Sequence, residues 1–293
     1  MFQQKSMEKK KVLLIWATTV LFLFYSLVPV VWAFIISITP ERYLYTYSEE
    51  WFPSNISLSR YIAILTGTEI KGTYVTRSMT EPFLKALINS IVISLSVTFL
   101  SIMLGLPSSF AFKWLKFPCK RILFSLIIFI IVSPIILLLP SIFVIYKQLN
   151  LLDTKLGLIL LYLGWGLPYT IWILKSYFDT IPKDIFESAL MDGCTYTSMI
   201  YKIFIPLSAP GIVAGAIMSF LLSWNEFLSA LILTNTLSSK TFPVVLAEFV
   251  GEYSIDYNTI ATGAIIACIP ALLFTVFLQK YMIKGLTSGA IKG

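Results

Sequence analysis

The chain is divided by long runs of residues that carry no charge. An α-helix needs about 20 predominantly apolar residues to cross the hydrocarbon core of a bilayer, and charges at that depth are costly. Runs of this kind occur at Val12–Pro40, Ala86–Phe112, Ile122–Tyr146, Leu156–Leu174, Tyr257–Gln279 and, interrupted only by Glu226, at Pro210–Leu233. The pattern predicts an all-α membrane protein with six transmembrane helices.

The composition excludes a water-soluble fold of this length. Of the 293 residues, 57% are hydrophobic and 13% are charged, whereas an average soluble domain has about 25% charged residues. A mean hydropathy of +0.85 leaves more apolar surface than a soluble domain can bury. Lipid is therefore the expected solvent for most of the chain.

The runs and the polar segments between them predict the organisation of the chain. We expect a cytoplasmic N-terminus at 1–11, a first transmembrane helix at 12–38 and an extracytoplasmic loop at 39–83. A five-helix core is expected at 84–284, with a cytoplasmic loop at 178–208 inside it. Residues 285–293 are expected to form a cytoplasmic C-terminal tail.

The basic residues predict the orientation. If the N-terminus is cytoplasmic, most of the 22 Lys and Arg residues fall in inside segments, beginning with Lys9, Lys10 and Lys11. This is the positive-inside pattern, with both termini in the cytoplasm. The net charge of +7 therefore requires no nucleic-acid partner.

Residues that commonly carry catalysis are absent or scattered. The sequence has no histidine, and Cys119, Cys194 and Cys268 form no CxxC pair. Histidine is the commonest general base and metal ligand, so triads and zinc sites built on it are excluded. We expect no catalytic residue and no metal in this chain.

The predicted cytoplasmic loop has the pattern of two short helices joined by a tight corner. Pro182 suits a first helical turn, and Gly193 suits the left-handed residue that ends a helix. Thr195 or Thr197 is a candidate cap for a second helix, which Pro206 and Pro210 would end. Between Pro182 and Gly193, four residues share an apolar face that needs a surface to bury against: Ile185, Phe186, Ala189 and Leu190.

The same loop resembles a known motif. Glu187-Ser188-Ala189, then Asp192-Gly193, then Ile203-Phe204-Ile205-Pro206 resembles the EAA…G…I-x-LP loop of ABC (ATP-binding cassette) importer permeases. This sequence departs from the motif at Ser188, where Ala is usual, and at Ile205, where Leu is usual.

The resemblance implies a type-1 ABC importer permease fold whose loop forms a coupling helix on a separate ATPase. It implies Glu187 as a polar contact to that ATPase, Ala189 as a close-packing residue and Gly193 as the corner. Ser188, Asp192 and Pro206 complete the implied coupling set. An amphipathic helix that rests on lipid headgroups is the alternative.

The chain has no means of its own to use ATP. It contains no GxxxxGK[ST] phosphate loop and no Gly-Lys dipeptide. We therefore expect this chain to bind no cofactor, with ATP and Mg used by the partner subunit.

One acid lies within a predicted span. Glu226 follows Trp224 and Asn225, roughly 24 Å from the start of that span at 1.5 Å per residue. An intramembrane carboxylate indicates a translocation pathway or a polar helix contact, and both interpretations remain open. Trp224 and Asn225 together offer the apolar plane and the amide that a sugar ring would accept.

Trp224-Asn-Glu-Phe-Leu228 and the ending Lys284-Gly-Leu-Thr-Ser-Gly-Ala-Ile-Lys-Gly293 resemble the maltose-type carbohydrate-uptake permeases in particular. In that family the glycine-rich tail, here including Gly289 and Lys292, reaches toward the ATPase; a frayed terminus is the alternative. The resemblance implies a saccharide importer in a prokaryotic plasma membrane. Its expected partners are a second homologous permease, two ATP-binding subunits and an extracytoplasmic solute-binding protein.

The sequence also allows alternatives to a saccharide importer. A polyol or a sugar phosphate is an alternative solute. An ion-coupled secondary transporter should show paired repeats and buried ionisable relays, and the sequence shows neither. A membrane enzyme would have to act without histidine or an acid pair in the membrane. Co-purification with an ATPase in detergent separates the importer from both.

Overall fold

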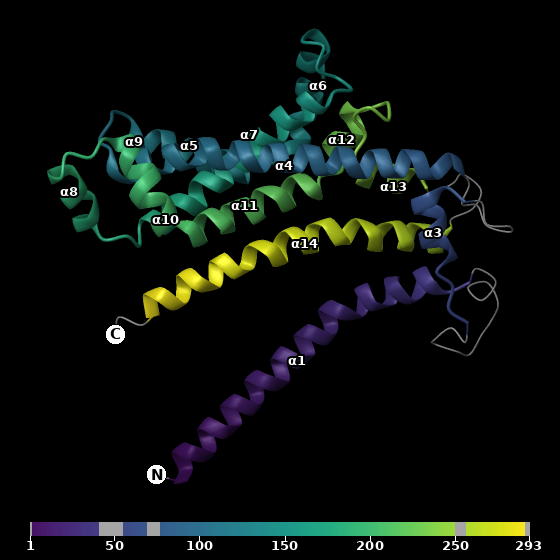
Figure 1. The fold of residues 1–293 in the computed structure, drawn as a ribbon, viewed down its shortest axis with the longest axis horizontal. Helices are drawn as coiled ribbons and strands as arrows, with labels where there is room; N and C mark the ends of the chain where they lie inside the picture. The colour runs from purple at the N-terminus through teal and green to yellow at the C-terminus, as the bar shows by residue number, and fades with distance from the viewer. Residues whose placement is uncertain (1, 41–54, 69–76, 250–255, 291–293) are drawn as a thin grey trace. The chain divides into compact units, whose positions relative to one another are not determined.

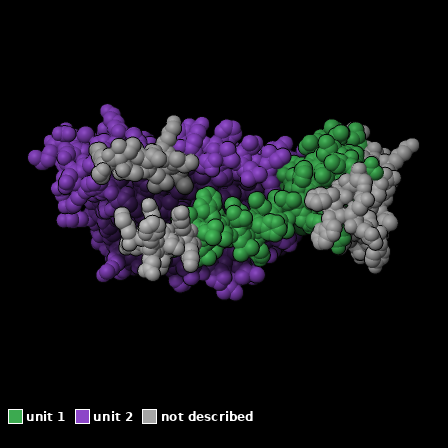
Figure 2. Space-filling view, turned by 90° about the horizontal axis from the view of Figure 1, so that it is seen from below, with its two compact units in different colours: residues 1–81, 246–266 green, residues 82–245, 267–293 purple. Residues whose placement is uncertain are grey.

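A computed structural model describes residues 2–40, 55–68, 77–249 and 256–290. Within these ranges every regular element is a helix (Figure 1). The chain divides into two compact units, one of residues 1–81 and 246–266 and the other of residues 82–245 and 267–293 (Figure 2). Two long helices, α4 (Arg77–Trp114) and α14 (Tyr257–Ala290), contribute residues to both units.

The first unit joins the end of α1 (Phe2–Ile38) to α3 (Ser59–Thr66) and to the start of α14. The side-chain amide of Asn258 donates to the carbonyl oxygens of Ile36 and Thr39, each at 2.7 Å. Arg60 and Asp256, both buried, form an ion pair at 3.9 Å. Polar contacts therefore fix the end of α1, although most of its apolar surface is exposed.

The second unit contains the remaining helices. They are α5 (Lys120–Val132), α6 (Leu139–Gln148), α7 (Lys155–Phe178), α8 (Lys183–Met191), α9 (Tyr196–Met199), α10 (Ile205–Leu207), α11 (Ala209–Trp224) and α12 (Leu228–Leu233). The short helix α13 (Phe242–Glu248) begins in this unit and ends in the first one. Glycines allow α4, α7 and α11 to pack closely. A Cβ on Gly166 would lie 3.1 Å from Ser219 Oγ and 3.2 Å from Ser101 Oγ, and one on Gly211 would lie 2.7 Å from the Tyr177 ring.

Four helical stretches of the described residues are long and apolar enough to cross a membrane. They are Lys11–Ile38, Thr80–Trp114, Lys155–Phe178 and Tyr257–Tyr281. A fifth is possible if Tyr196–Leu207 and Ala209–Trp224, which meet at 84°, count as one span. The fold is thus that of a multi-pass helical membrane protein, and these four helices overlap the first, second, fourth and sixth predicted spans.

The third predicted span, Ile122–Tyr146, is not one continuous helix. Helix α5 ends at Val132, and Ser133 has an extended backbone (ψ 127°) before Pro134. Proline disfavours a helical conformation in the residue before it. A 3₁₀ turn, Ile135–Leu137, and α6 follow. The break leaves a cavity of about 600 Å³ whose lining includes Phe129, Ile130, Pro134, Tyr146 and Trp165.

The fifth predicted span, Pro210–Leu233, is also broken. Helix α11 ends at Trp224 and α12 starts at Leu228, so the residues between them are not helical. The sixth predicted span continues further than expected, since α14 remains helical to Ala290. The segment expected as a tail from 285 is therefore helical as far as the structure describes it.

Candidate functional site

Helix α8 and its glycine corner lie between α7 and α11 in the chain. Gly193 has a left-handed backbone (φ 73°). Its N–H donates to the carbonyl of Leu190, and the N–H of Cys194 donates to the carbonyl of Ala189, each at 3.0 Å. These two bonds are the Schellman pattern that ends a helix at a left-handed residue. The predicted corner is confirmed.

The second half of the loop differs from the prediction in one respect. Thr195 caps α9 by accepting from the N–H of Ser198 at 3.3 Å, as expected of one of the two candidate threonines. However, Pro206 does not end the second helix, since it lies in the first turn of α10. The helical stretch Tyr196–Leu207 does end before Pro210, which lies in the first turn of α11. Proline lacks an N–H, and in a first turn that donor would be unpaired in any case. A π-helical turn, Ile200–Phe204, precedes Pro206.

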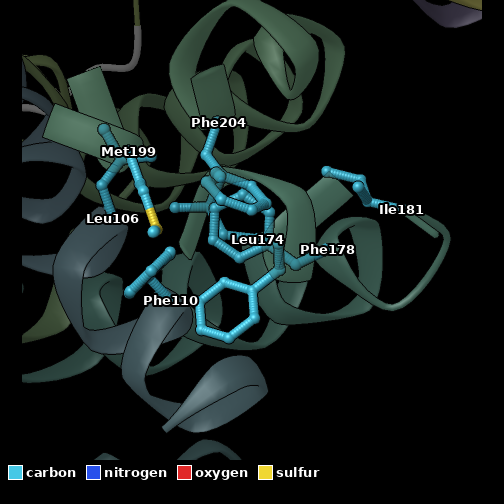
Figure 3. Packing of buried hydrophobic residues seen from close by; sticks show 9 residues of the cluster. Leu106, Phe110, Leu174, Phe178, Ile181, Met199 and Phe204 are labelled. Atoms are coloured by element: carbon cyan, nitrogen blue, oxygen red, sulfur yellow. The ribbon is translucent and has the colours of Figure 1, made fainter. Parts of the chain in front are cut away.

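The inner face of α8 is buried within its own chain. Phe186 and Ala189 belong to a core cluster with residues of α4 and α7 and of the segment after Gly193. Trp114 of α4 stacks on Phe186 with ring centroids 4.9 Å apart and planes 11° apart. Figure 3 shows members of this cluster gathered together, with Ile181 to one side: Leu106, Phe110, Leu174, Phe178, Met199 and Phe204. Of the apolar face that the sequence predicted, Ile185, Phe186 and Ala189 are therefore covered by the ends of α4 and α7, whereas the prediction is wrong for Leu190, which is exposed.

The outer face of α8 is exposed and mixed in character. Glu187 pairs with Lys183 one turn earlier, and the pairing raises the pKa of Lys183. Ser188 and Asp192 are exposed. Two apolar side chains stand beside them, Leu190 and Met191, and Met191 is 88% exposed. Of the predicted coupling residues, only Ala189 is buried; Glu187, Ser188, Asp192, Gly193 and Pro206 all remain at the surface.

Trp224 is not displayed toward open space. Its side chain is 2% exposed. Its ring stacks on Phe220, with centroids 5.4 Å apart, and contacts Phe242 at 4.8 Å. The indole plane that the sequence offered to a sugar is occupied by aromatic residues of the same chain.

Glu226 lies in the break between α11 and α12 and is satisfied within the chain. Its carboxylate accepts from the N–H of Ser229 at 2.8 Å and of Ala230 at 3.2 Å, which are unpaired donors of the first turn of α12. It also accepts from the hydroxyl of Tyr162 of α7 at 2.8 Å. Non-helical backbone at membrane depth requires such partners. This geometry favours the polar helix contact over the pathway for Glu226.

Asn225 differs from its two neighbours because it is exposed. Its side-chain amide nitrogen donates to the carbonyl of Leu221 at 2.9 Å, at the end of α11. That bond orients the amide and uses one of its donors, so the amide oxygen and a second N–H are left for other partners.

Sequence reasoning missed a second polar contact in the same unit. Asp153, between α6 and α7, accepts from the N–H groups of Asn235 and Thr236, each at 2.9 Å, and from the hydroxyls of Thr236 and Ser239. Burial raises the pKa of this carboxyl, but the hydrogen bonds from Ser239, Thr236 and Asn235 outweigh it and lower the pKa to about 2. Asp153 has a left-handed backbone (φ 55°), which Asp tolerates better than most residues. The residue type at this position is therefore the only signal of the contact that the sequence offers.

The two residues predicted for the ATPase-contacting tail lie at or beyond the end of α14. Gly289 falls on the last turns of α14, and Lys292 lies outside the described residues. Within the described ranges, no group of three or more His, Cys, Asp or Glu residues is placed to hold a metal ion.

The fold and this loop define a multi-pass helical membrane protein with a short amphipathic helix outside its spans. The chain belongs to the family of binding-protein-dependent transport system inner membrane components, whose profile matches residues 98–288. It is a permease, a non-catalytic component of an ATP-driven transport system.

Several characterised proteins are similar to this chain over nearly its whole length. The trehalose transport system permease protein SugB of Mycobacterium tuberculosis is 37% identical over 92% of this chain and 93% of its own. The sulfoquinovosyl glycerol transport system permease protein SmoH of Agrobacterium fabrum is 30% identical over 92% and 90%. The diacetylchitobiose uptake system permease protein DasC of Streptomyces coelicolor is 28% identical over 94% and 95%.

A solved structure shares the fold. A chain of a bacterial ABC transporter involved in the import of the acidic polysaccharide alginate matches with a TM-score of 0.73, covering 92% of this chain and 95% of that one. The sequence identity is 19%, so the match shows the fold alone.

Proposed function

We propose that this chain forms half of the translocation pathway of a saccharide importer and couples it to a separate ATPase through α8. The other half is a second, homologous permease. Two ATP-binding subunits use ATP and Mg, and an extracytoplasmic solute-binding protein delivers the solute. Counting α5 to α6 and α11 to α12 as one broken span each gives six crossings, with both termini in the cytoplasm of a prokaryotic cell.

The names of the relatives support a saccharide as the solute. Trehalose, diacetylchitobiose and sulfoquinovosyl glycerol each contain a sugar unit. A relative in Synechocystis, 33% identical over 71% of this chain, is named for osmoprotective compounds. A small solute that is not a saccharide, such as a polyol, is therefore the second candidate.

The observation that carries the coupling role is the division of α8 into two faces. Phe186 and Ala189 pack on residues near the ends of α4 and α7, while Leu190 and Met191 stand exposed. Because the inner face is buried, α8 cannot shift without disturbing the aromatic cluster that includes Phe110 and Trp114. A partner bound to the outer face therefore acts on two membrane helices.

For the pathway itself, the geometry favours Asn225 over its neighbours. Trp224 is buried, and Glu226 has three donors of its own chain. We therefore assign Asn225 to the solute and Glu226 to holding the break in shape. Asn225→Ala should raise the solute concentration needed for half-maximal uptake and leave ATPase binding intact.

Co-purification tests the coupling role. The full chain is tagged and extracted in a mild detergent from its own host, and the attached subunits are identified by mass spectrometry. We expect an ATP-hydrolysing subunit with the wild type. The Leu190→Asp/Met191→Asp variant, changed only on the outer face, should lose it.

The matched control is Lys147→Ala, an exposed change at the end of α6. It should retain the ATPase. A wild-type chain that transports solute without any ATPase would instead support the ion-coupled alternative.

A further inference from the structure

Three lysine side chains converge near the ends of α4 and α7 and the start of α5. Lys113 and Lys175 both pair with Asp179, at 3.0 and 2.9 Å. Lys120 donates to the carbonyl oxygens of Leu115 at 2.9 Å and Lys113 at 3.4 Å. We refer to Lys113, Lys120, Lys175 and Asp179 as the lysine cluster.

The cluster has more positive than negative charge. Its three amines are matched by one carboxylate, and that carboxylate is 45% exposed. Lys116 and Arg121, on the same short segment of chain, are exposed as well. Burial lowers the pKa of Lys120, and the charges of Lys175 and Lys113 lower it further, against the opposing effect of Asp179. An anion placed among these amines would relieve their repulsion.

Aromatic rings place this charge at the level where a membrane meets water. The Lys175 amine lies 5.0 Å from the Phe124 ring centroid, and the Lys113 amine lies 5.2 Å from that of Trp114. The apolar stretch of α4 ends at Trp114, and that of α7 ends at Phe178. Tryptophan and basic side chains are typical of the headgroup level.

An apolar stripe leads from the cluster along α5. None of the residues of α5, all of which the structure describes, is buried. Leu123, Leu126 and Ile130 are exposed at spacings of three and four residues, so they share one side of the helix. Ile130 also lines the cavity at the break after Val132. It lies ten residues beyond Lys120, about 15 Å along a helix, which matches half of a hydrocarbon core of about 30 Å.

We propose that the lysine cluster and the α5 stripe bind one anionic phospholipid, with its phosphate among the amines and an acyl chain against Leu123, Leu126 and Ile130. Charge complementarity selects this occupant: a partner helix would suit the stripe but not the net positive charge. Basic pockets beside transmembrane helices bind anionic headgroups by the same physics. This site adjoins the aromatic cluster under α8, because Trp114 contacts both Lys113 and Phe186. It shares no residue with the proposed coupling and pathway residues and does not depend on the identity of the solute.

Native mass spectrometry tests the proposal on the full chain, purified with whatever subunits accompany it. Phosphatidylglycerol is titrated against phosphatidylcholine of the same chain length. We expect one tightly bound phosphatidylglycerol with the wild type. The Lys113→Gln/Lys175→Gln variant should bind it roughly 10- to 30-fold more weakly, because each basic residue near a membrane surface strengthens binding about fivefold. The control variant Lys147→Gln, which removes a basic residue at the end of α6, should bind the lipid as the wild type does.

A second variant distinguishes a direct effect on lipid binding from a loss of folding. Asp179→Asn removes the competing carboxylate and should strengthen phosphatidylglycerol binding several-fold, which a purely structural ion pair would not do. Equal binding of the two lipids, or unchanged binding in the double variant, overturns the proposal. Displacement of the lipid by millimolar inorganic phosphate also overturns it, since the site would then be one for a free anion.

Discussion

The hydroxyl of Tyr162 donates to the carboxylate of Glu226 across 2.8 Å, joining α7 to the break between α11 and α12. The two residues are 64 positions apart in the chain. The contact explains how an acid is accommodated inside a predicted span: its oxygens satisfy donors that the break exposes. It also makes the shape of the break depend on α7.

Removing the Glu226 carboxylate should destabilise this region. Glu226→Ala leaves the N–H groups of Ser229 and Ala230 and the Tyr162 hydroxyl without their acceptor, at a cost of about 1–3 kcal/mol for each buried group left unpaired. Thermal unfolding in detergent should show a clearly lower midpoint. Glu226→Gln keeps an acceptor oxygen and should lie much closer to the wild type; a similar loss in both variants would point to the charge instead.

The corner at Gly193 should tolerate asparagine but not valine. No atom lies within 4 Å of a Cβ built at this position, so only the left-handed backbone opposes substitution. That conformation costs an ordinary residue about 1–2 kcal/mol, and a β-branched residue suffers more than asparagine. We expect Gly193→Val to reach the membrane yet lose ATPase co-purification and uptake, and Gly193→Asn to retain both. Wild-type uptake by the valine variant would refute this role.

Two glycines of α7 should respond oppositely to alanine. A Cβ on Gly157 would lie 2.3 Å from the carbonyl oxygen of Leu151, which is backbone and cannot rotate away. A Cβ on Gly164 would meet nothing within 4 Å. Gly157→Ala should therefore lower the unfolding midpoint by several degrees. Gly164→Ala should leave it unchanged or raise it, since alanine is favoured over glycine in a helix by roughly 0.5–1 kcal/mol.

The contribution of Asp153 should depend on pH. Its folded pKa of about 2 lies below the value near 3.9 expected for an unfolded chain. The group therefore stabilises the fold fully above that unfolded value and loses its contribution as the pH falls toward 2. Asp153→Asn, which tolerates the same left-handed backbone, should unfold at a lower temperature than the wild type at pH 7. The difference should shrink between pH 4 and pH 2, and a constant difference across that range would exclude the ionic contribution.

Local signals in the sequence predicted the corner of the α8 loop well. Gly193 and Thr195 act through their own backbone and the next few residues, so their roles follow from residue type and spacing. Periodicity also predicted three of the buried or partly buried residues of α8, but it wrongly placed the exposed Leu190 on the same face. The covering of this face was not predictable, because Phe110 and Trp114 come from a helix more than 70 residues earlier in the chain.

The two broken spans show that an uncharged run predicts a membrane crossing but not whether its helix is continuous. Pro134 was visible, but proline inside a span permits a kink as well as a break, and only the extended backbone at Ser133 distinguishes them. The end of α11 at Trp224 has no proline or glycine to mark it. It depends on the acceptor that Glu226 supplies and on Tyr162, so no local pattern predicts it.

The two faces of α8 differ in how freely their residues can be substituted. Residues such as Phe186 are constrained by the packing of the permease itself, whereas Leu190 and Met191 are constrained only by whatever binds them. Under the proposed docking role, the choice of ATPase is determined by a few outward side chains that can be transferred between permeases. Exchanging a few outward residues between related permeases should redirect a chain to a different ATPase while its folding, membrane insertion and solute preference stay the same.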